Sequence, residues 1–517
     1  MLKPALVGGT LVLVATQGTP RAMRTYGVTV WATVAAFAGL LSCALSPQHA
    51  PAVQPGGDAE YPLPADDWRG SAGEILSGAI QIRTVNPPGG EAALAEWLSL
   101  VLSGEPGIET RVVRLGSDEE APRAAFWARV QGSGRARPIV LLSHLDTVPA
   151  DPAGWTVDPF AGVIGGGFVV GRGALDAKGV TVAHLLTLVA LARRDVPPAR
   201  DVILLATPDE EAGGLHGAAL IARDRRDLLG EAEFLLTEGG GILPGSPRRT
   251  PDASQPDIWG VAFTEKTPCW MDVVARGIPG HASAGGAAGA PEHLVAALAA
   301  LRDLPTPIEV VPAVARMFAS MAVVAPPDDR EHFAQLRGAL ELNPEFRERF
   351  LADRGRAALV RNTAAVTTLD AGENMNVIPG EARATIDARL LPGASCSDFV
   401  ADVREAVGPD IEVTVRLAFE AAESPVDTPL LAAIERVAER HTPRGVVVPR
   451  VIAGFTDAHW FRKLGITSYG FVPRRLRPIE TRGVHGPNER VSLDNLQFGV
   501  DTLLEILDEL DAGSRSR

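Results

Sequence analysis

The sequence predicts an α/β protein whose main domain, a mixed sheet flanked by helices, is interrupted by a smaller α+β domain. Residues 61–265 alternate short apolar runs with helical patterns, which is typical of a sheet covered by helices. Residues 266–418 follow the order strand, helix, strand, strand, helix, strand, which indicates a small antiparallel sheet with two helices on one face. The first pattern resumes over 419–517, so the sequence predicts one sheet domain in two segments.

The elements of 61–265 are predicted from periodicity. Apolar residues at helical spacing predict helices over 71–82, 91–102 and 180–191. Continuous apolar runs predict strands that are buried on both faces, and these runs cover 139–142, 201–206 and 233–237.

The smaller domain is predicted from alternating and helical patterns. Its strands are expected over 268–277, 363–369, 381–391 and 411–417, and its helices over 291–301 and 397–407. The last segment then has a helix over 430–439 and strands near 446 and 467.

A stretch at 306–362 is longer than a minimal domain of this kind needs. It is mostly helical in pattern and contains charged runs such as Glu345-Phe346-Arg347-Glu348-Arg349. Two roles are open for this insertion: it shapes a substrate entrance, or it is a solvated elaboration of the surface. We favour the second as the expectation.

Composition limits the function classes. A chain of 517 residues is too long for one ordinary domain and long enough for two. The hydrophobic content of 46% and the charged content of 22% are values of a globular protein. The net charge of −14, without a basic stripe, argues against a nucleic-acid partner.

Residues 1–60 are predicted to lie outside the fold. An apolar run over 28–41 follows Arg24 and ends in Leu40-Leu41-Ser42-Cys43, which is typical of a bacterial lipoprotein signal. Met23 lies shortly before this run and is a candidate for the true start of the protein.

We therefore expect an exported protein that is anchored in a membrane by a lipid on Cys43. An uncleaved helical anchor over 28–45 is the alternative, although this run is barely long enough to span a bilayer. Residues 44–60 are rich in proline and glycine and are expected to form a tether.

The chain has three cysteines, Cys43, Cys269 and Cys396, which are too few for a disulfide framework and contain no Cys-x-x-Cys pair. Cys269 and Cys396 could pair in an exported protein. Buried free thiols are the expectation, since unpaired cysteine behaves as a small apolar residue.

Polar residues follow the predicted strands of the main sheet. His144 and Asp146 come directly after the run at 139–142. On a strand, an aspartate two residues after a histidine points to the same face, and it can fix the imidazole tautomer that binds a metal. Asp176 lies in a glycine-rich loop at 171–179, where its carboxylate can bridge two cations. Taken alone, this stretch could also be a surface His-Asp pair beside a turn.

Three further candidates occupy similar places. Glu211 follows the strand at 201–206, Glu238 follows the strand at 233–237, and His485 lies in a late loop. Ligands of open α/β sheets bind at the carboxyl ends of the strands, so these side chains are predicted to converge with His144 and Asp176. Histidine and carboxylate ligands without cysteine suit zinc in a hydrolytic site.

The order of these motifs resembles the co-catalytic zinc exopeptidase family of aminoacylases, carboxypeptidase S, carboxypeptidase G and succinyl-diaminopimelate desuccinylase. The matching motifs are His-x-Asp at 144–146, Asp-x-Lys-Gly at 176–179 and Glu-Glu-x-Gly at 210–213, followed by Glu238 and His485. Two more motifs look like the carboxypeptidase S branch: Gly-Phe-Thr-Asp at 454–457 and Asn-Val-Ile-Pro at 376–379.

This resemblance covers about 67–510. It implies a zinc-exopeptidase catalytic domain interrupted by a ferredoxin-like lid, which in this family also forms dimers.

The resemblance implies a role for each motif residue. Asp176 would bridge two zinc ions, for which Co²⁺ or Mn²⁺ could substitute. His144 and Glu238 would complete the ligands of one ion, and Glu211 and His485 those of the other. Glu210 would be the general base that takes a proton from the attacking water and passes it to the leaving nitrogen. Asp146 would orient His144.

The resemblance also implies lid residues. His281, in Gly-His-Ala-Ser at 280–283, would donate to the tetrahedral oxyanion, in dimers often across the subunit interface. Arg389 would hold a free carboxylate of the substrate, with Asn376 nearby and Thr456 opposite. Arg389 could equally be a salt-bridge residue of its strand, and His281 a polar residue at a helix start.

The predicted function is that of a zinc-dependent amidohydrolase of the metallopeptidase class. Its substrates would be small molecules, namely N-acyl amino acids or short peptides with a free carboxylate, and an apolar acyl group is expected to be preferred over succinyl. A dipeptidase or a desuccinylase of the same family is the alternative. A catalytically dead, lipid-anchored binding protein is disfavoured because all five ligands and Glu210 are present. A serine hydrolase is disfavoured because no Gly-x-Ser-x-Gly follows a strand.

Overall fold

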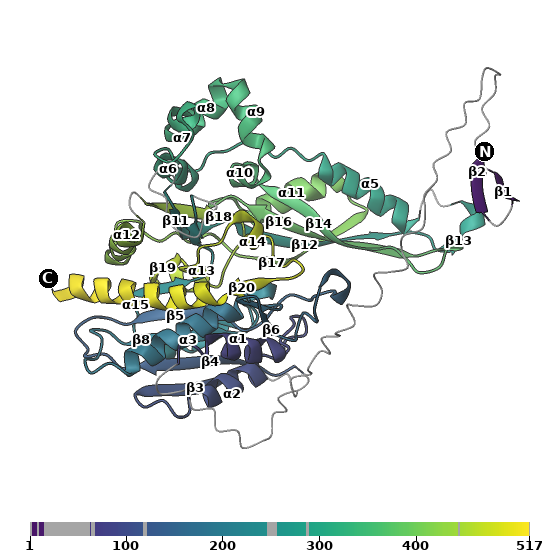
Figure 1. The fold of residues 1–517 in the computed structure, drawn as a ribbon. Helices are drawn as coiled ribbons and strands as arrows, with labels where there is room; N and C mark the ends of the chain where they lie inside the picture. Colours follow the sequence, from purple (N-terminus) through teal and green to yellow (C-terminus); the bar gives the residue numbers. More distant parts are fainter. Residues whose placement is uncertain are drawn as a thin grey trace. The chain divides into compact units, whose positions relative to one another are not determined.

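The protein is described by a computed structural model, drawn in Figure 1, over residues 3–7, 10–14, 63, 68–116, 121–245, 256–285, 289–442 and 445–515. The chain forms two compact units, Met1–Asp58 and Ala59–Arg517. In the first, β1 (Lys3–Val7) pairs antiparallel with β2 (Thr10–Val14). The expected lipid-attachment motif at 40–43, the alternative anchor over 28–45 and the tether lie outside the described residues. No helix of the described ranges is long and apolar enough to cross a membrane.

The second unit is built on a nine-stranded mixed sheet in the order β10-β11-β19-β9-β5-β8-β4-β3, with β18 paired to β11. The four central strands run parallel to one another: β5 (Ile139–His144), β8 (Val202–Thr207), β9 (Phe234–Thr237) and β19 (Thr467–Gly470). Because parallel strands end at the same edge, the residues that follow them come close together.

The outer strands complete this sheet. On one side lie the antiparallel strands β3 (Ile108–Leu115) and β4 (Arg123–Val130), which the periodicity of the sequence did not reveal. On the other side lie β10 (Gly241–Leu243), β11 (Ile258–Glu265) and β18 (Val446–Ile452). A separate small sheet joins β6 (Val163–Gly165), β7 (Phe168–Val170) and β20 (Arg490–Ser492).

Helices cover both faces of the main sheet (Figure 1). Ile139 and Leu141 of β5 pack into a core with α1 (Ala72–Gln81), α2 (Ala92–Val101), α3 (Lys178–Ala192), α12 (Pro429–His441) and α15 (Leu493–Arg515). Val140 and Leu142 pack on the opposite face with α4 (Ala218–Asp224) and α13 (Ala458–Arg462). Burial on both faces is the reason why this strand is continuously apolar.

The lid is a four-stranded antiparallel sheet in the order β14-β16-β12-β17. Its elements are β12 (Thr267–Arg276), α5 (Ala290–Arg302), β14 (Thr363–Asp370), β16 (Glu381–Leu390), α11 (Cys396–Val407) and β17 (Ile411–Ala418). The two helices and the sheet share a core of their own, as the sequence pattern predicted. A two-stranded ribbon joins β13 (Gly280–His281) to β15 (Val377–Ile378). Only Lys266 separates β11 of the main sheet from β12 of the lid.

Cys269 and Cys396 form a disulfide bond, so the expectation of free thiols is wrong. The bond joins β12 to the start of α11 within the lid core. Pairing requires two Cα atoms within bonding reach, here 5.5 Å apart across 127 residues of sequence. The fold sets this separation, and the spacing of the cysteines along the chain does not show it.

The insertion belongs to the core of the main domain, so the expectation of a solvated elaboration is wrong. It forms α6 (Pro312–Met321), α7 (Arg330–Ala334), α8 (Leu336–Leu342), α9 (Pro344–Ala352) and α10 (Arg354–Leu359). Four phenylalanines from these helices pack on one another: Phe318, Phe333, Phe346 and Phe350.

Helix α6 places the insertion against the main sheet. It packs along β18, and the backbone N–H of Val451 donates to the sulfur of Met317 over 3.4 Å. Lys266, between the two sheets, donates to the carbonyl oxygens of Ala358 and Arg361 at the end of the insertion, each over 2.9 Å. The charged runs of the sequence cover the outer faces of helices whose inner faces are apolar.

Candidate active site

His144 is the last residue of β5, and its imidazole is buried at the carboxyl edge of the sheet. Its Nδ1 lies 3.0 Å from the carbonyl oxygen of Asp146 and 3.4 Å from the Asp146 Oδ1. Two acceptors beside Nδ1 favour a proton on that nitrogen, which leaves the lone pair of Nε2 for a metal. Asp146 thus has the geometry that its predicted orienting role requires.

Asp146 also fixes the neighbouring acidic pair. Its Oδ1 accepts a hydrogen bond from the backbone N–H of Glu210 over 3.1 Å, and its Oδ2 accepts one from the N–H of Glu211 over 3.0 Å. The side-chain amide of Asn86 donates to the same Oδ2 over 2.8 Å. Asp209 has a φ of 75°, so the chain turns sharply between β8 and the pair. One carboxylate therefore ties the end of β5 to the residues that follow β8.

Asp176 lies between the two histidines. Its Oδ1 is 2.9 Å from the Nε2 of His144, and its Oδ2 is 3.2 Å from the Nε2 of His485. One oxygen faces each imidazole, which is the arrangement that a carboxylate needs to bridge two cations.

The loop that carries Asp176 is held by Glu489. The Glu489 carboxylate accepts hydrogen bonds from the backbone N–H groups of Gly173, Leu175 and Asp176 over 3.2, 2.7 and 3.0 Å. Arg172 donates to the same carboxylate over 2.6 Å. Because Glu489 is fully buried, it positions Asp176 without facing the cavity.

Two glutamates extend the cluster. The Oε1 of Glu238, directly after β9, is 3.4 Å from the Nε2 of His144, and the Oε2 of Glu211 is 3.1 Å from the Nε2 of His485. Zinc bonds of 2.0–2.2 Å in a tetrahedral site put neighbouring ligand atoms roughly 3.3–3.5 Å apart, so these spacings suit metal ligands. Glu210 lies farther away, with its Oε2 4.0 Å from the Nε2 of His144.

The cluster concentrates negative charge where little water reaches it. Burial, together with Glu238, raises the pKa of Glu210 well above its usual range. Burial raises the pKa of Glu238 to about 7. Hydrogen bonds to Asp176 and Glu211 raise the pKa of His485 to about 10. The metal-free cluster therefore retains protons near neutral pH, and a bound cation would take their place.

The residues present fit a metal centre. The Oε1 of Glu211 is buried and has no hydrogen-bond partner among the described residues, so its lone pairs are available to a cation. Two groups of three residues that share His144 could each hold a metal ion. One is His144, Glu210 and Glu238, and the other is His144, Asp176 and Glu211; within each group the ligand atoms lie within 4.8 Å of one another. Imidazole and carboxylate donors suit zinc, and they also accept Co²⁺ or Mn²⁺.

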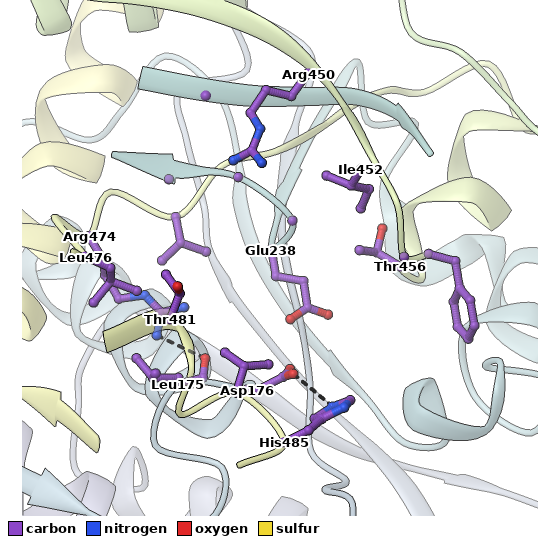
Figure 2. Close-up of a pocket in the computed structure, with 18 of the residues that line it drawn as sticks. Leu175, Asp176, Glu238, Arg450, Ile452, Thr456, Arg474, Leu476, Thr481 and His485 are labelled. Atoms are coloured by element: carbon purple, nitrogen blue, oxygen red, sulfur yellow. Dashed lines mark hydrogen bonds and ion pairs between the residues drawn. The ribbon is translucent and has the colours of Figure 1, made fainter. Parts of the chain in front are cut away.

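A cavity of about 830 Å³ opens beside the cluster (Figure 2). Its volume is within the range of about 300–1,000 Å³ that is usual for small-molecule sites. Asp176, Glu210, Glu211, Glu238 and His485 form part of its wall. Much of the remaining wall is apolar and includes Ile242, Ile258, Met317, Met321, Val448 and Leu476. Since Met317 and Met321 belong to α6, the insertion helps to shape this cavity.

Two of the predicted substrate-binding residues line the cavity, Arg389 and Thr456. The guanidinium of Arg389 donates to the Asp387 carboxylate over 2.6 and 2.9 Å, and it lies 4.6 Å from the ring centre of Phe455. Arg389 is thus both a cavity residue and a salt-bridge residue of its strand. The hydroxyl of Thr456 donates to Glu265 over 3.2 Å.

His281 and Asn376 lie elsewhere, on the exposed ribbon of the lid. The carbonyl oxygen of Asn376 accepts from the N–H of Ala282 over 3.0 Å, and the Nδ1 of His281 lies 2.8 Å from the Ser283 hydroxyl. Neither residue is part of the cavity wall. Within this chain, the structure does not bring them to the cluster around Asp176, and their roles stay predictions.

Four residues of the site were not predicted from the sequence: Asn86, Glu489, Arg450 and Arg474. Asn86 and Glu489 hold the cluster from behind, and Arg450 and Arg474 line the cavity. The sequence did offer an indication for Glu489, because this residue ends the motif that contains His485. The other three have no motif around them, and only the fold places them here.

The chain is similar to known proteins in its sequence and its fold. The model of peptidase family M20/M25/M40 matches residues 140–509. The mouse N-fatty-acyl-amino acid synthase/hydrolase PM20D1 is 30% identical over 462 residues, which cover 86% of this chain and 89% of the mouse protein. The probable carboxypeptidase S-like 2 of Dictyostelium discoideum is 29% identical over 374 residues, which cover 71% of this chain and 70% of that protein.

A solved structure shows the same fold. The M20 family metallo-carboxypeptidase Sso-CP2 from Sulfolobus solfataricus superposes with a TM-score of 0.66 at 18% identity, over 85% of this chain and 99% of that chain. The resemblance that the motifs indicated is therefore confirmed. The chain belongs to peptidase family M20/M25/M40, and it is a hydrolase.

Proposed function

We propose that the protein hydrolyses the amide bond of N-acyl amino acids at a site that binds two zinc ions. The observation that carries this proposal is Asp176, which faces one histidine with each carboxylate oxygen at the wall of a largely apolar cavity. The name of the mouse relative supports an acyl amino acid as the substrate, and the apolar wall suits an apolar acyl chain. The proposed ligands are His144, Asp176, Glu211, Glu238 and His485.

The bound ions would supply Lewis acidity to a water molecule and to the amide carbonyl. Glu210 would act as the general base, because it lies beside the cluster and farther from His144 than Glu238 does. It would take a proton from the water and deliver it to the leaving nitrogen. Asp146 keeps Glu210 in place through its backbone N–H.

The lid residues are part of the same proposal. Arg389 would bind the carboxylate of the amino acid with Thr456 opposite, and His281, beside Asn376, would donate to the oxyanion after lid movement or from a second copy of the chain in a homodimer. His281→Ala should then mainly lower kcat, and Arg389→Ala should mainly raise KM. Steady-state kinetics on one substrate measure both, and wild-type values for both variants would contradict the lid assignment.

Export as a lipid-anchored protein is proposed from Leu40-Leu41-Ser42-Cys43. The disulfide between Cys269 and Cys396 supports it, because such bonds persist in oxidising compartments. Mass spectrometry of the protein from membranes should find a lipid on Cys43; an unmodified N-terminus at Met1 or Met23 would contradict the proposal.

Metal analysis and a substrate panel test the proposed function together. We expect about two zinc ions per chain, loss of activity with a chelator, and recovery on addition of zinc. In the panel, N-acyl amino acids with apolar acyl groups should react faster than dipeptides or succinyl-diaminopimelate. Faster hydrolysis of succinyl-diaminopimelate than of every apolar N-acyl amino acid would favour a desuccinylase, and a preference for dipeptides would favour a dipeptidase.

A further inference from the structure

Arg450 is a cationic residue of the cavity that the proposed function does not use. It lies on β18, and its guanidinium points into the cavity (Figure 2). Among the described residues, none forms a hydrogen bond or an ion pair with this guanidinium. The two other arginines of the wall do have partners: Arg389 pairs with Asp387, and Arg474 donates to the carbonyl oxygen of Leu175 over 3.0 Å.

The neighbouring strand makes room for Arg450. A Cβ atom added at Gly260 of β11 would lie 2.2 Å from the Cδ of Arg450 and 3.2 Å from its Nη1. The aliphatic part of the Arg450 side chain therefore occupies the space that a side chain at position 260 would need. Any residue other than glycine at that position would displace the arginine. Gly260 itself lines the cavity beside Gly241, its partner in β10.

A charged group in such a place needs a counter-charge. Arg450 is partly buried, and burial lowers the pKa of its guanidinium from the usual value. A buried charge without a partner is costly, and a partner that hydrogen-bonds to it relieves the cost. An anion that enters the cavity with the substrate would supply this partner.

The place of Arg450 indicates which part of the substrate reaches it. Strands β19 and β11 separate β18 from β9, which carries Glu238 at its end. Three strand spacings correspond to roughly 14 Å between the backbones of β9 and β18. The wall near Arg450 includes the apolar residues Ile258 and Val448. In Figure 2, Glu238 lies between Arg450 and the pair Asp176–His485.

We propose that Arg450 binds an anionic group at the far end of the substrate's acyl chain. The substrate class would be N-acyl amino acids whose acyl chain is apolar along its length and ends in a carboxylate. A guanidinium suits this task because its planar fork binds a carboxylate through two parallel hydrogen bonds. The inference rests on the proposed function, since it assumes that the amide lies at the Asp176 cluster.

Matched substrates test this inference. Each pair shares one amino acid and one acyl chain length, and the chain ends in either a carboxylate or a methyl group. For chains long enough to reach Arg450, wild-type kcat/KM should be higher for the carboxylate-ended member. Arg450→Met should reduce this preference by about 10- to 100-fold, the range expected for a hydrogen-bonded charge. Arg450→Lys should keep part of it, and Gly260→Ala should lower it by displacing the arginine stem.

Arg389→Ala is the matched control, because both members of a pair carry the same amino-acid carboxylate. This substitution should lower kcat/KM for both members of a pair by the same factor and leave the preference between them unchanged. An equal loss on both members in Arg450→Met, or an unchanged preference, would overturn the inference. If the wild type cleaves no N-acyl amino acid, the proposed function fails. Calorimetric binding of free dicarboxylic and monocarboxylic acids to wild type and Arg450→Met then still tests Arg450: an equal affinity of both acids for the wild type would overturn its role.

Discussion

Replacing Glu210 by glutamine is expected to lower kcat by about 10²–10⁴ and to leave both zinc ions bound. The substitution keeps the size of the side chain and the backbone N–H that donates to Asp146. It removes the carboxylate that would take the proton from water. Zinc stoichiometry and kcat, measured on the same preparation, check both halves of this expectation.

Glu211→Gln is the control for this variant. The two glutamates are adjacent, and Asp146 holds both of their N–H groups. The Oε2 of Glu211 lies 3.1 Å from the Nε2 of His485, whereas the Oε2 of Glu210 lies 4.0 Å from the Nε2 of His144. The two side chains therefore point toward different histidines. Glu211→Gln should therefore lower the affinity of the site for one of the two zinc ions. Full activity in Glu210→Gln, or zinc loss confined to that variant, would show that the two roles are exchanged.

Asp176→Asn is expected to lose activity through loss of metal. The amide has one oxygen, so it cannot face both His144 and His485 with an acceptor as the carboxylate does. Changing an outer partner of a metal ligand usually costs about 10–100-fold in metal affinity, and loss of the bridging ligand should cost more. Competition with a chromogenic chelator measures the affinity.

Glu489→Gln provides the comparison, since Glu489 acts only through the loop that carries Asp176. Its zinc affinity should fall by about 10–100-fold, less than in Asp176→Asn. Thermal unfolding of both variants checks that the fold is intact. A zinc affinity of Asp176→Asn equal to that of the wild type would contradict the bridging role.

The sequence indicated which polar residues follow the central strands, and there is a physical reason for this. His144, Glu211 and Glu238 follow strands that are buried on both faces, so their apolar runs are continuous and easily recognised. The lid was equally visible in its alternating strands. By contrast, β3 and β4 lie at the margin of the sheet and carry mixed patterns.

Other features depend on contacts between distant segments. The disulfide joins residues 127 positions apart, and the insertion packs on β18 from a place in the sequence inside the lid. Arg450 becomes notable only because Gly260 leaves room for it and no described acidic residue pairs with it. Such relations arise from tertiary packing, and neither periodicity nor a local motif records them.

The central claim is that Asp176 joins two metal ions and that Glu210 ligates neither. X-ray diffraction from zinc-loaded crystals, recorded at the zinc absorption edge, tests it directly. We expect two anomalous peaks, one contacted by His144, Asp176 and Glu238 and the other by Asp176, Glu211 and His485. A single peak, or a peak bound by Glu210 in place of Glu238, would contradict it.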